Sequence, residues 1–339
     1  MRYALLMKPH ANVRYRQSLE KLALNELALL LAAWNMEDAS PRVETVAGEP
    51  FLVFETEQMT EEAWRDISRH SAACFAAKVE GEALLPIARS QCSTLPDELP
   101  HVLKYKGKTN ADFTYMMLHC AKAASAFARS QEKLRVLDPM CGKATTLMCA
   151  LCEGNDAVGI DMDQKALQEA DGYFERALKL HRIKHKRTQQ SRTLPGGGSA
   201  QAVLYAVAAD AQAMKDGQTQ SLEIIHGDAA RASEMVKPGS VHLIVSDLPY
   251  GVQHAPKEGG GMSSLARLLR RVTPACAKAL KKGGAAAFSF NLHTLPRKEV
   301  EQAMEAAGLE VLRDGPCADF SHWVEQAVDR DVVIAVKKA

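Results

Sequence analysis

Two well-separated segments of this 339-residue chain combine an apolar run with an aspartate and a turn. The first reads Leu134-Arg135-Val136-Leu137-Asp138-Pro139-Met140-Cys141-Gly142. The second reads Val241-His242-Leu243-Ile244-Val245-Ser246-Asp247-Leu248-Pro249-Tyr250-Gly251. Such runs are typical of buried parallel strands, whose carboxyl ends form the ligand-binding edge of open α/β folds. The sequence therefore predicts that both turns lie at one ligand-binding edge.

The first turn and the two predicted strand ends after it have the residues of a nucleoside-cofactor site. Gly142 lets the backbone approach a ligand closely, and the helix that opens at Thr145 and Thr146 exposes free N–H groups. Asp161 follows Asp138 at the spacing of an acid that accepts hydrogen bonds from ribose hydroxyls. Asp228 ends the next strand, where it can accept from an adenine amino group. A nicotinamide dehydrogenase would share the first features, but it requires neither Asp228 nor the second turn.

The second turn has the residues needed to activate an exocyclic amine. The amine of a purine is a poor nucleophile because its lone pair is delocalised into the ring. The Asp247 carboxylate and the Leu248 carbonyl would each accept an N–H, which localises that lone pair. Pro249 fixes the turn, and Tyr250 offers a flat face for stacking on a base. A methyl-bearing sulfonium is already activated, so alignment would supply most of the catalysis. The turn therefore predicts methyl transfer to a base; the structural alternative is a simple Asp-Pro-type turn.

Strands and helices alternate from Leu134 onward, which predicts a doubly wound α/β sheet. The predicted strands are 135–138, 157–160, 222–225, 241–245 and 285–290, with helices at 143–153 and 164–180. Segments 309–312 and 332–336 are predicted to form an antiparallel pair. We place the catalytic domain at residues 131–339.

Residues 1–82 predict a separate small domain. Its strands are expected at 3–7, 42–46, 50–54 and 72–79, and its helices at 17–33 and 60–70. The order β-α-β-β-α-β is that of a ferredoxin-like domain, which by itself indicates no function. Residues 83–130 are predicted to be a linker with a connecting helix over 111–127.

An insertion of about residues 181–200 separates the second helix from the third strand of the predicted catalytic domain. Residues 180–187 are densely basic, and 193–199 are rich in glycine and predict a flexible joint. The insertion is either a solvated, partly disordered loop or a flap that contacts phosphates. The predicted RNA-binding residues are Lys104, Lys106, Lys108, Lys179, Arg182, Lys184, Lys186 and Arg187.

Composition favours a cytoplasmic globular protein without a membrane span. Hydrophobic residues make up 47% of the chain, and a net charge of +1 excludes a globally basic nucleic-acid coat but not local basic patches. The eight cysteines lie mostly in apolar segments, as expected of reduced thiols. No metal is predicted, because Cys149 and Cys152, like His181 and His185, lack further ligands at a suitable spacing. Gly107-Lys108-Thr109 lacks the earlier glycine of a phosphate-binding loop.

The two turns together resemble those of the THUMP-type, or UPF0020, family of RNA guanine-N2 methyltransferases. The resemblance extends to residues 107–110 with their helix and to the N-terminal strand and helix. It implies a class I S-adenosylmethionine-dependent methyltransferase fold, with guanine N2 in tRNA as the expected acceptor. The target base would be held by Asp247, Leu248, Pro249 and Tyr250. The cofactor would be held by Asp138, Met140, Cys141, Gly142, Thr145, Thr146, Asp161, Met162, Asp228, Ala229 and Asp247.

The chain departs from the family pattern in three respects. Ala144 stands where the family usually has a second glycine, and Lys143 where it has a small polar residue. Leu248 replaces the commoner proline, and the residues before position 131 leave little room for a complete THUMP domain beside a ferredoxin-like one. One alternative is an amino-methyltransferase for DNA adenine or protein glutamine. The DNA enzyme would need a separate target-recognition domain, and the glutamine enzyme would favour Asn at position 247. The other alternative is a non-catalytic RNA-binding module with a decayed cofactor loop.

Overall fold

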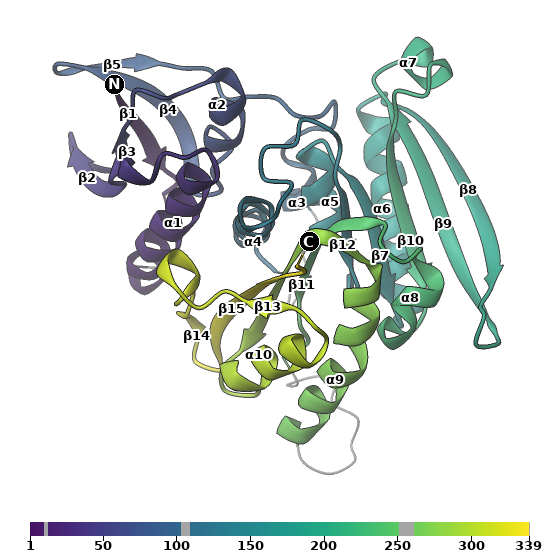
Figure 1. The fold of residues 1–339 in the computed structure, drawn as a ribbon. Coiled ribbons are helices and arrows are strands. Elements are labelled where there is room, and N and C mark those ends of the chain that lie inside the picture. The colour runs from purple at the N-terminus through teal and green to yellow at the C-terminus, as the bar shows by residue number, and fades with distance from the viewer. Residues whose placement is uncertain (10–12, 103–108, 251–260, 339) are drawn as a thin grey trace.

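The computed structural model describes residues 1–9, 13–102, 109–250 and 261–338 (Figure 1). Gly251 and the predicted RNA contacts Lys104, Lys106 and Lys108 lie outside these residues. None of the helices in the described ranges has both the length and the apolar character that a membrane span requires.

The N-terminal unit follows the predicted order of elements. It comprises β1 (Arg2–Met7), α1 (Val13–Ala33), a 3-10 turn (Glu37–Ala39), β2 (Arg42–Val46), β3 (Glu49–Glu55), α2 (Glu61–Ile67), β4 (Ala73–Glu80) and β5 (Ala83–Pro86). The antiparallel sheet has the order β2-β3-β1-β4-β5, and β5 is a strand that the sequence analysis missed. Leu27 and Leu31 of α1 and Ile67 of α2 are buried in the core with Leu5 and Leu52 of the sheet. Thr60 caps α2 as expected, accepting a hydrogen bond from the Ala63 N–H at 3.1 Å.

The catalytic unit is built on a ten-stranded mixed sheet of order β13-β15-β12-β11-β6-β7-β10-β9-β8, with β14 paired to β15. The central strands β10, β7, β6, β11 and β12 are parallel. The strands are β6 (Arg135–Asp138), β7 (Asp156–Asp161), β8 (Lys184–Thr193), β9 (Ser199–Ala208), β10 (Gln220–His226), β11 (Val241–Asp247), β12 (Leu280–Asn291), β13 (Glu310–Val311), β14 (His322–Glu325) and β15 (Val328–Val336). The predicted antiparallel pair near the C-terminus is confirmed by β13 and β15.

Helices cover both faces of this sheet, as a doubly wound fold requires. Successive strand residues alternate between two cores: Val136 and Leu243 lie in the core with α4, α5 and α6, while Leu137 and Ile244 lie in the core with α8, α9 and α10. The helices are α3 (Leu99–Val102), α4 (Ala111–Ala124), α5 (Thr145–Cys152), α6 (Gln164–Leu180), α7 (Ala211–Lys215), α8 (Ala232–Met235), α9 (Gly261–Ala279) and α10 (Arg297–Ala306), with 3-10 turns at Ala229–Arg231 and Gly315–Cys317.

The predicted flexible insertion is wrong: these residues form the β8–β9 hairpin, which extends the sheet at one edge (Figure 1). Residues 194–198 form its turn, where the Leu194 N–H donates to the Gly198 carbonyl at 3.0 Å and Gly197 and Gly198 have positive φ. Strand β9 is buried on both faces: Tyr205 and Val207 lie in the core with α4, α5 and α6, while Ala202 lies in the core with α8, α9 and α10. The sequence did not reveal the hairpin because β8 is polar on both faces and alanine gives β9 a weak strand pattern.

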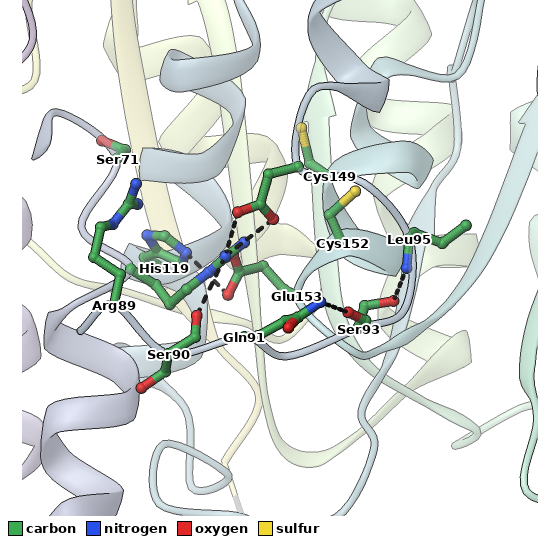
Figure 2. A network of polar contacts seen from close by, with 12 residues as sticks. Ser71, Arg89, Ser90, Gln91, Ser93, Leu95, His119, Cys149, Cys152 and Glu153 are labelled. Atoms are coloured by element: carbon green, nitrogen blue, oxygen red, sulfur yellow. Dashed lines mark hydrogen bonds and ion pairs between the residues drawn. The ribbon is translucent and has the colours of Figure 1, made fainter. Parts of the chain in front are cut away.

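A buried charge network joins the N-terminal unit to the catalytic unit. Glu26 of α1 accepts from the Ser71 N–H at 2.9 Å and contacts His119 Nδ1 of α4 at 2.7 Å. On its other side, His119 Nε2 lies 3.5 Å from Glu153, the residue that ends α5 (Figure 2). Arg69 donates to Glu153 at 2.7 and 2.9 Å and also pairs with Asp97. Because α4 packs on both α1 and the catalytic sheet, the network fixes the two units together.

Candidate active site

Four aspartates lie where parallel strands end, at one edge of the catalytic sheet. Asp138 ends β6, Asp161 ends β7, Asp228 follows β10 and Asp247 ends β11. Register pairs Asp161 with His226, so β7 and β10 end level, and it pairs Asp138 with Gly159, so β6 ends two residues before the tip of β7. The two turns singled out in the sequence are directly linked, since the Ser246 hydroxyl donates to Asp138 at 2.7 Å.

The Asp247 carboxylate is half-buried and surrounded by hydroxyl groups. Ser289 of β12 donates to Oδ1 at 2.7 Å, and the Tyr250 hydroxyl lies 2.8 Å from Oδ1 and 3.0 Å from Oδ2. Thr109 donates to Oδ2. A carboxylate has about four acceptor sites, so these three donors orient it and leave capacity for an incoming N–H.

The rest of the second turn is packed against its neighbours. Leu248 is buried, and its N–H donates to the Ser289 carbonyl at 2.9 Å. Pro249 is half-buried. Burial beside Asp247 holds the pKa of the Tyr250 phenol well above its usual range. The Arg330 guanidinium lies 5.4 Å from the Tyr250 ring centre. The stacking of Tyr250 on a base stays a prediction. The contact of its hydroxyl with Asp247 was not predicted from the sequence.

The turn after β6 has an open backbone cradle at Gly142. Gly142 has φ of +49°, and no described atom lies within 4 Å of the position that a Cβ would take. Its N–H donates to Asp161 Oδ2 at 2.7 Å, while the Asp163 N–H donates to Oδ1 at 2.8 Å. Asp161 thus holds the turn and retains acceptor capacity on both oxygens.

The backbone conformation at Ala144 explains why the family usually has glycine at this position. It has φ of +68° and ψ of 28°, a left-handed conformation that costs a non-glycine residue about 1–2 kcal/mol. Its side chain is fully buried in the core with α5. The alanine therefore strains the turn but keeps the conformation that a glycine would adopt there.

Asp138 lies beneath the turn, and its side chain is buried. It accepts from the Met140 N–H at 3.1 Å as well as from Ser246. Burial raises its pKa to about 7, although hydrogen bonds from Ser246 and Thr146 act in the opposite direction. Cys141 is also buried, and its N–H donates to the Ile160 carbonyl at 3.0 Å. Asp138 and Cys141 therefore support the turn from within the protein.

The remaining predicted cofactor residues differ in exposure. Met162 is 69% exposed at the tip of β7, whereas Thr145, Thr146 and Ala229 are buried. Asp228 accepts from the Ala230 N–H at 2.9 Å and pairs with the exposed Arg271 at 3.0 Å. The open Gly142 cradle, the spare acceptors of Asp161 and the exposed apolar Met162 fit a nucleoside cofactor with a charged amino-acid tail.

Replacing Asp161 with alanine should weaken S-adenosylmethionine binding by about 1–3 kcal/mol. Two ribose hydroxyls would lose their acceptor, and the Gly142 N–H would lose its partner. Isothermal titration calorimetry with S-adenosylmethionine and its demethylated product measures the change. Asp163→Ala is the neighbouring control, because that carboxylate caps α6 and is not placed in the cofactor site. Equal affinity in Asp161→Ala and the parent protein would remove Asp161 from the site.

The predicted RNA contacts separate into two groups. Arg182, Lys184 and Lys186 are exposed, and Lys179 is 64% exposed with an ion pair to Glu175. Arg187 instead binds both carboxylate oxygens of Asp171, at 3.0 and 2.7 Å, beneath the hairpin. Its charge is therefore already engaged within the protein. Among the described residues, no group of three or more His, Cys, Asp or Glu side chains is placed to hold a metal ion.

Sequence reasoning missed two hydroxyl residues that contact Asp247. Thr109 belongs to a rejected phosphate-loop pattern and to the segment 107–110 of the family resemblance, and neither linked it to Asp247. Ser289 lies within a strand that gave no functional signal. Register pairs Ser289 with Asp247 across β12 and β11. Ser246 was part of the second segment, and its contact with Asp138 could have been inferred from neighbouring strand ends.

One comparison with known proteins gives a family match. Residues 114–312 match the family model UPF0020, described as "RMKL-like, methyltransferase domain". A search of curated proteins found no significant match. Similar solved structures include a TehB-like SAM-dependent methyltransferase from Corynebacterium glutamicum (14% identity, covering 69% of this chain and 90% of that chain, TM-score 0.39). An rRNA methylase from Streptococcus thermophilus shows 9% identity, covers 69% and 100%, and has a TM-score of 0.35. These similarities are too low to indicate a substrate.

The mixed sheet, the strand-end site and the matched domain define a class I methyltransferase whose cofactor is S-adenosylmethionine. The family model covers more than half of the chain, so the chain belongs to the UPF0020 family.

Proposed function

We propose that this protein transfers a methyl group to an exocyclic amine of a base in RNA, with guanine N2 in tRNA as the acceptor. The observation that carries the proposal is the Asp247 carboxylate, held by three hydroxyls at a strand end beside the cofactor turn. We also propose that residues 1–82 are a ferredoxin-like domain, 83–130 a connector and 131–339 the catalytic domain.

The residues of the site would have two roles, binding of the cofactor and positioning of the target amine. Gly142, Asp161 and Met162 would hold S-adenosylmethionine, which supplies an electrophilic methyl group when bound. Asp247 would accept an N–H of the target amine, which localises the lone pair of the nitrogen and aims it. As the new N–C bond forms and the bond between that methyl group and sulfur breaks, the amine must lose a proton, and the Asp247 carboxylate of the second turn would accept it. Positioning supplies most of the rate in this scheme.

Mass spectrometry of nucleosides from a deletion strain tests the proposal directly. Loss of N2-methylguanosine from tRNA, and its return when purified protein and S-adenosylmethionine are added to that RNA, is the expected result. Loss of N6-methyladenine from DNA or of methylglutamine from protein would replace the proposed substrate. An unchanged set of modifications together with absent cofactor binding would favour the non-catalytic alternative.

The exposed side of the β8–β9 hairpin base is proposed as a phosphate-binding surface. Lys179, Arg182, Lys184 and His185 line one shallow hollow where α6 meets β8, and Asp210 is the acidic residue in its lining. Lys186 is also exposed and lies two residues after Lys184 on β8, so the two side chains are on the same face of the strand. This surface replaces the predicted flap, and Arg187 is excluded from it because of its pairing with Asp171.

Replacing Lys179, Arg182, Lys184 and Lys186 with serine should flatten the dependence of RNA affinity on salt. Each phosphate contact releases counterions, so four lost contacts would reduce the slope of log K against log salt by about three. Fluorescence anisotropy with labelled tRNA at several salt concentrations measures the slope. Arg187→Ser is the matched control, which should leave the slope unchanged but lower stability. Equal slopes in the fourfold variant and the parent would show that this surface is solvent-exposed and does not bind the phosphates of RNA.

A further inference from the structure

The Asp247 carboxylate is held by hydroxyls from three separate parts of the chain. Tyr250 belongs to the same turn, and Ser289 lies opposite Asp247 on the neighbouring strand β12. Thr109 instead precedes the catalytic sheet in the sequence and reaches Asp247 across 138 positions. The turn itself explains the Tyr250 contact, and the pairing of β11 with β12 explains the Ser289 contact. Neither explains the contact with Thr109.

The position of Thr109 is fixed by the start of α4. The next residue, Asn110, caps this helix by accepting from the Asp112 N–H at 2.8 Å. Helix α4 is buried along most of its length between α1 and the catalytic sheet. Its residue His119 contacts Glu26 of the N-terminal unit at 2.7 Å. A rigid, doubly packed helix therefore presents the Thr109 hydroxyl to the carboxylate.

We propose that Thr109 is a positioning residue for methyl transfer, which acts by fixing the plane of the Asp247 carboxylate. The terminal torsion of an aspartate is broad, so the carboxylate needs external donors to adopt one orientation. Ser289 reaches Oδ1, and the Tyr250 hydroxyl lies 2.8 Å from Oδ1 and 3.0 Å from Oδ2, whereas Thr109 donates to Oδ2 alone. Without the Thr109 hydroxyl, Oδ2 would keep only the Tyr250 contact, which is shared with Oδ1, so the carboxylate could turn and misalign the target amine. This inference rests on the proposed function, because it assigns Thr109 a role in the same reaction.

The test compares Thr109→Val, which keeps the shape but removes the hydroxyl, with Thr109→Ser, which keeps the hydroxyl. Methyl transfer from labelled S-adenosylmethionine to total RNA of a deletion strain gives kcat and KM, and calorimetry gives cofactor affinity. We expect Thr109→Val to lower kcat about tenfold to a hundredfold, the range for a hydrogen bond to a charged group. KM and cofactor affinity should change little, and Thr109→Ser should restore most of kcat. Thr45→Val, at an exposed position on β2, is the matched control.

A double-mutant cycle separates positioning from a general structural role. In an Asp247→Asn background, Thr109→Val should cause only a small further loss, because the group it orients is already changed. A kcat of Thr109→Val equal to the parent, an equal loss in Thr109→Ser, or full additivity with Asp247→Asn would overturn the proposal. Should Thr109→Val fail to fold, Thr109→Ala provides the same comparison. Failure of the proposed function is distinguishable, because it would appear as absent RNA methylation by the parent protein itself.

Discussion

Asp247→Ala should abolish methyl transfer while leaving S-adenosylmethionine and RNA affinity nearly unchanged. The carboxylate would interact with the amine most strongly as the N–C bond forms, so its loss should lower turnover far more than binding. We expect activity to fall by at least a thousandfold, about 4 kcal/mol at the transition state. Single-turnover assays with undermethylated RNA measure the rate, and calorimetry measures binding.

Asp247→Asn tests whether the charge itself is required. The amide keeps the shape and one acceptor oxygen, so the contacts from Ser289 and Tyr250 can partly persist. Activity should fall strongly without disappearing, since a neutral acceptor polarises the amine less. Asp314→Asn, at an exposed position, is the matched control and should retain full activity. A parental rate in Asp247→Asn would show that charge is irrelevant here, and unfolding of both variants would make Asp247 a structural turn residue.

Glu26→Ala should destabilise the protein by about 3–5 kcal/mol, the usual cost of removing one member of a buried charge network. Glu26 is fully buried, and its loss leaves His119 and the Ser71 N–H without their acceptor. Chemical unfolding followed by far-UV circular dichroism measures the change, and a second transition would show that the two units have come apart. Glu82→Ala, an exposed control, should change stability by less than about 0.5 kcal/mol.

The same network predicts how stability depends on pH. Burial opposes the charge of His119, but Glu153 and Glu26 overcome it and raise its pKa to about 9. This contribution is complete below the ordinary pKa of 6.5 and is lost as pH rises through 9. Burial lowers the pKa of His70, so its contribution is present above 6.5 and is lost at lower pH. Burial also opposes the charge of Glu26, yet the neighbouring histidines lower its pKa to about 2, so its contribution is lost as pH falls from 4.5 towards 2.

The contribution of this network to stability should therefore be greatest near pH 6.5 and should decline on both sides. Thermal unfolding between pH 4 and pH 10 measures this curve. In Glu26→Ala the alkaline decline should be shallower, because His119 loses one of the two carboxylates that hold its proton. An alkaline limb of equal steepness in both proteins would contradict the assignment of that limb to His119.

The parallel sheet and the four aspartates at its edge could be predicted from the amino-acid sequence alone. Buried parallel strands have continuous apolar sequences. Each such segment here ends in a polar turn, and the residues of that turn indicate the chemistry of this edge of the sheet. The register of β6, β7 and β10 then follows from the fold class, so Asp138, Asp161 and Asp228 were placed from local pattern alone. Helix α6 was predicted at its observed bounds because it has clear periodicity and an aspartate cap.

The groups that surround those aspartates depend on long-range packing and could not be predicted from the sequence. Thr109 contacts Asp247 because α4 packs between two units, and no local pattern encodes that distance. The β8–β9 hairpin is stable because β9 pairs with β10, which outweighs the polar character of β8. Arg187 appeared to be a free cation in the sequence, but the folded hairpin brings it to Asp171. Strand ends are local properties of the chain, whereas hydroxyl donors, charge partners and edge strands are selected by long-range packing.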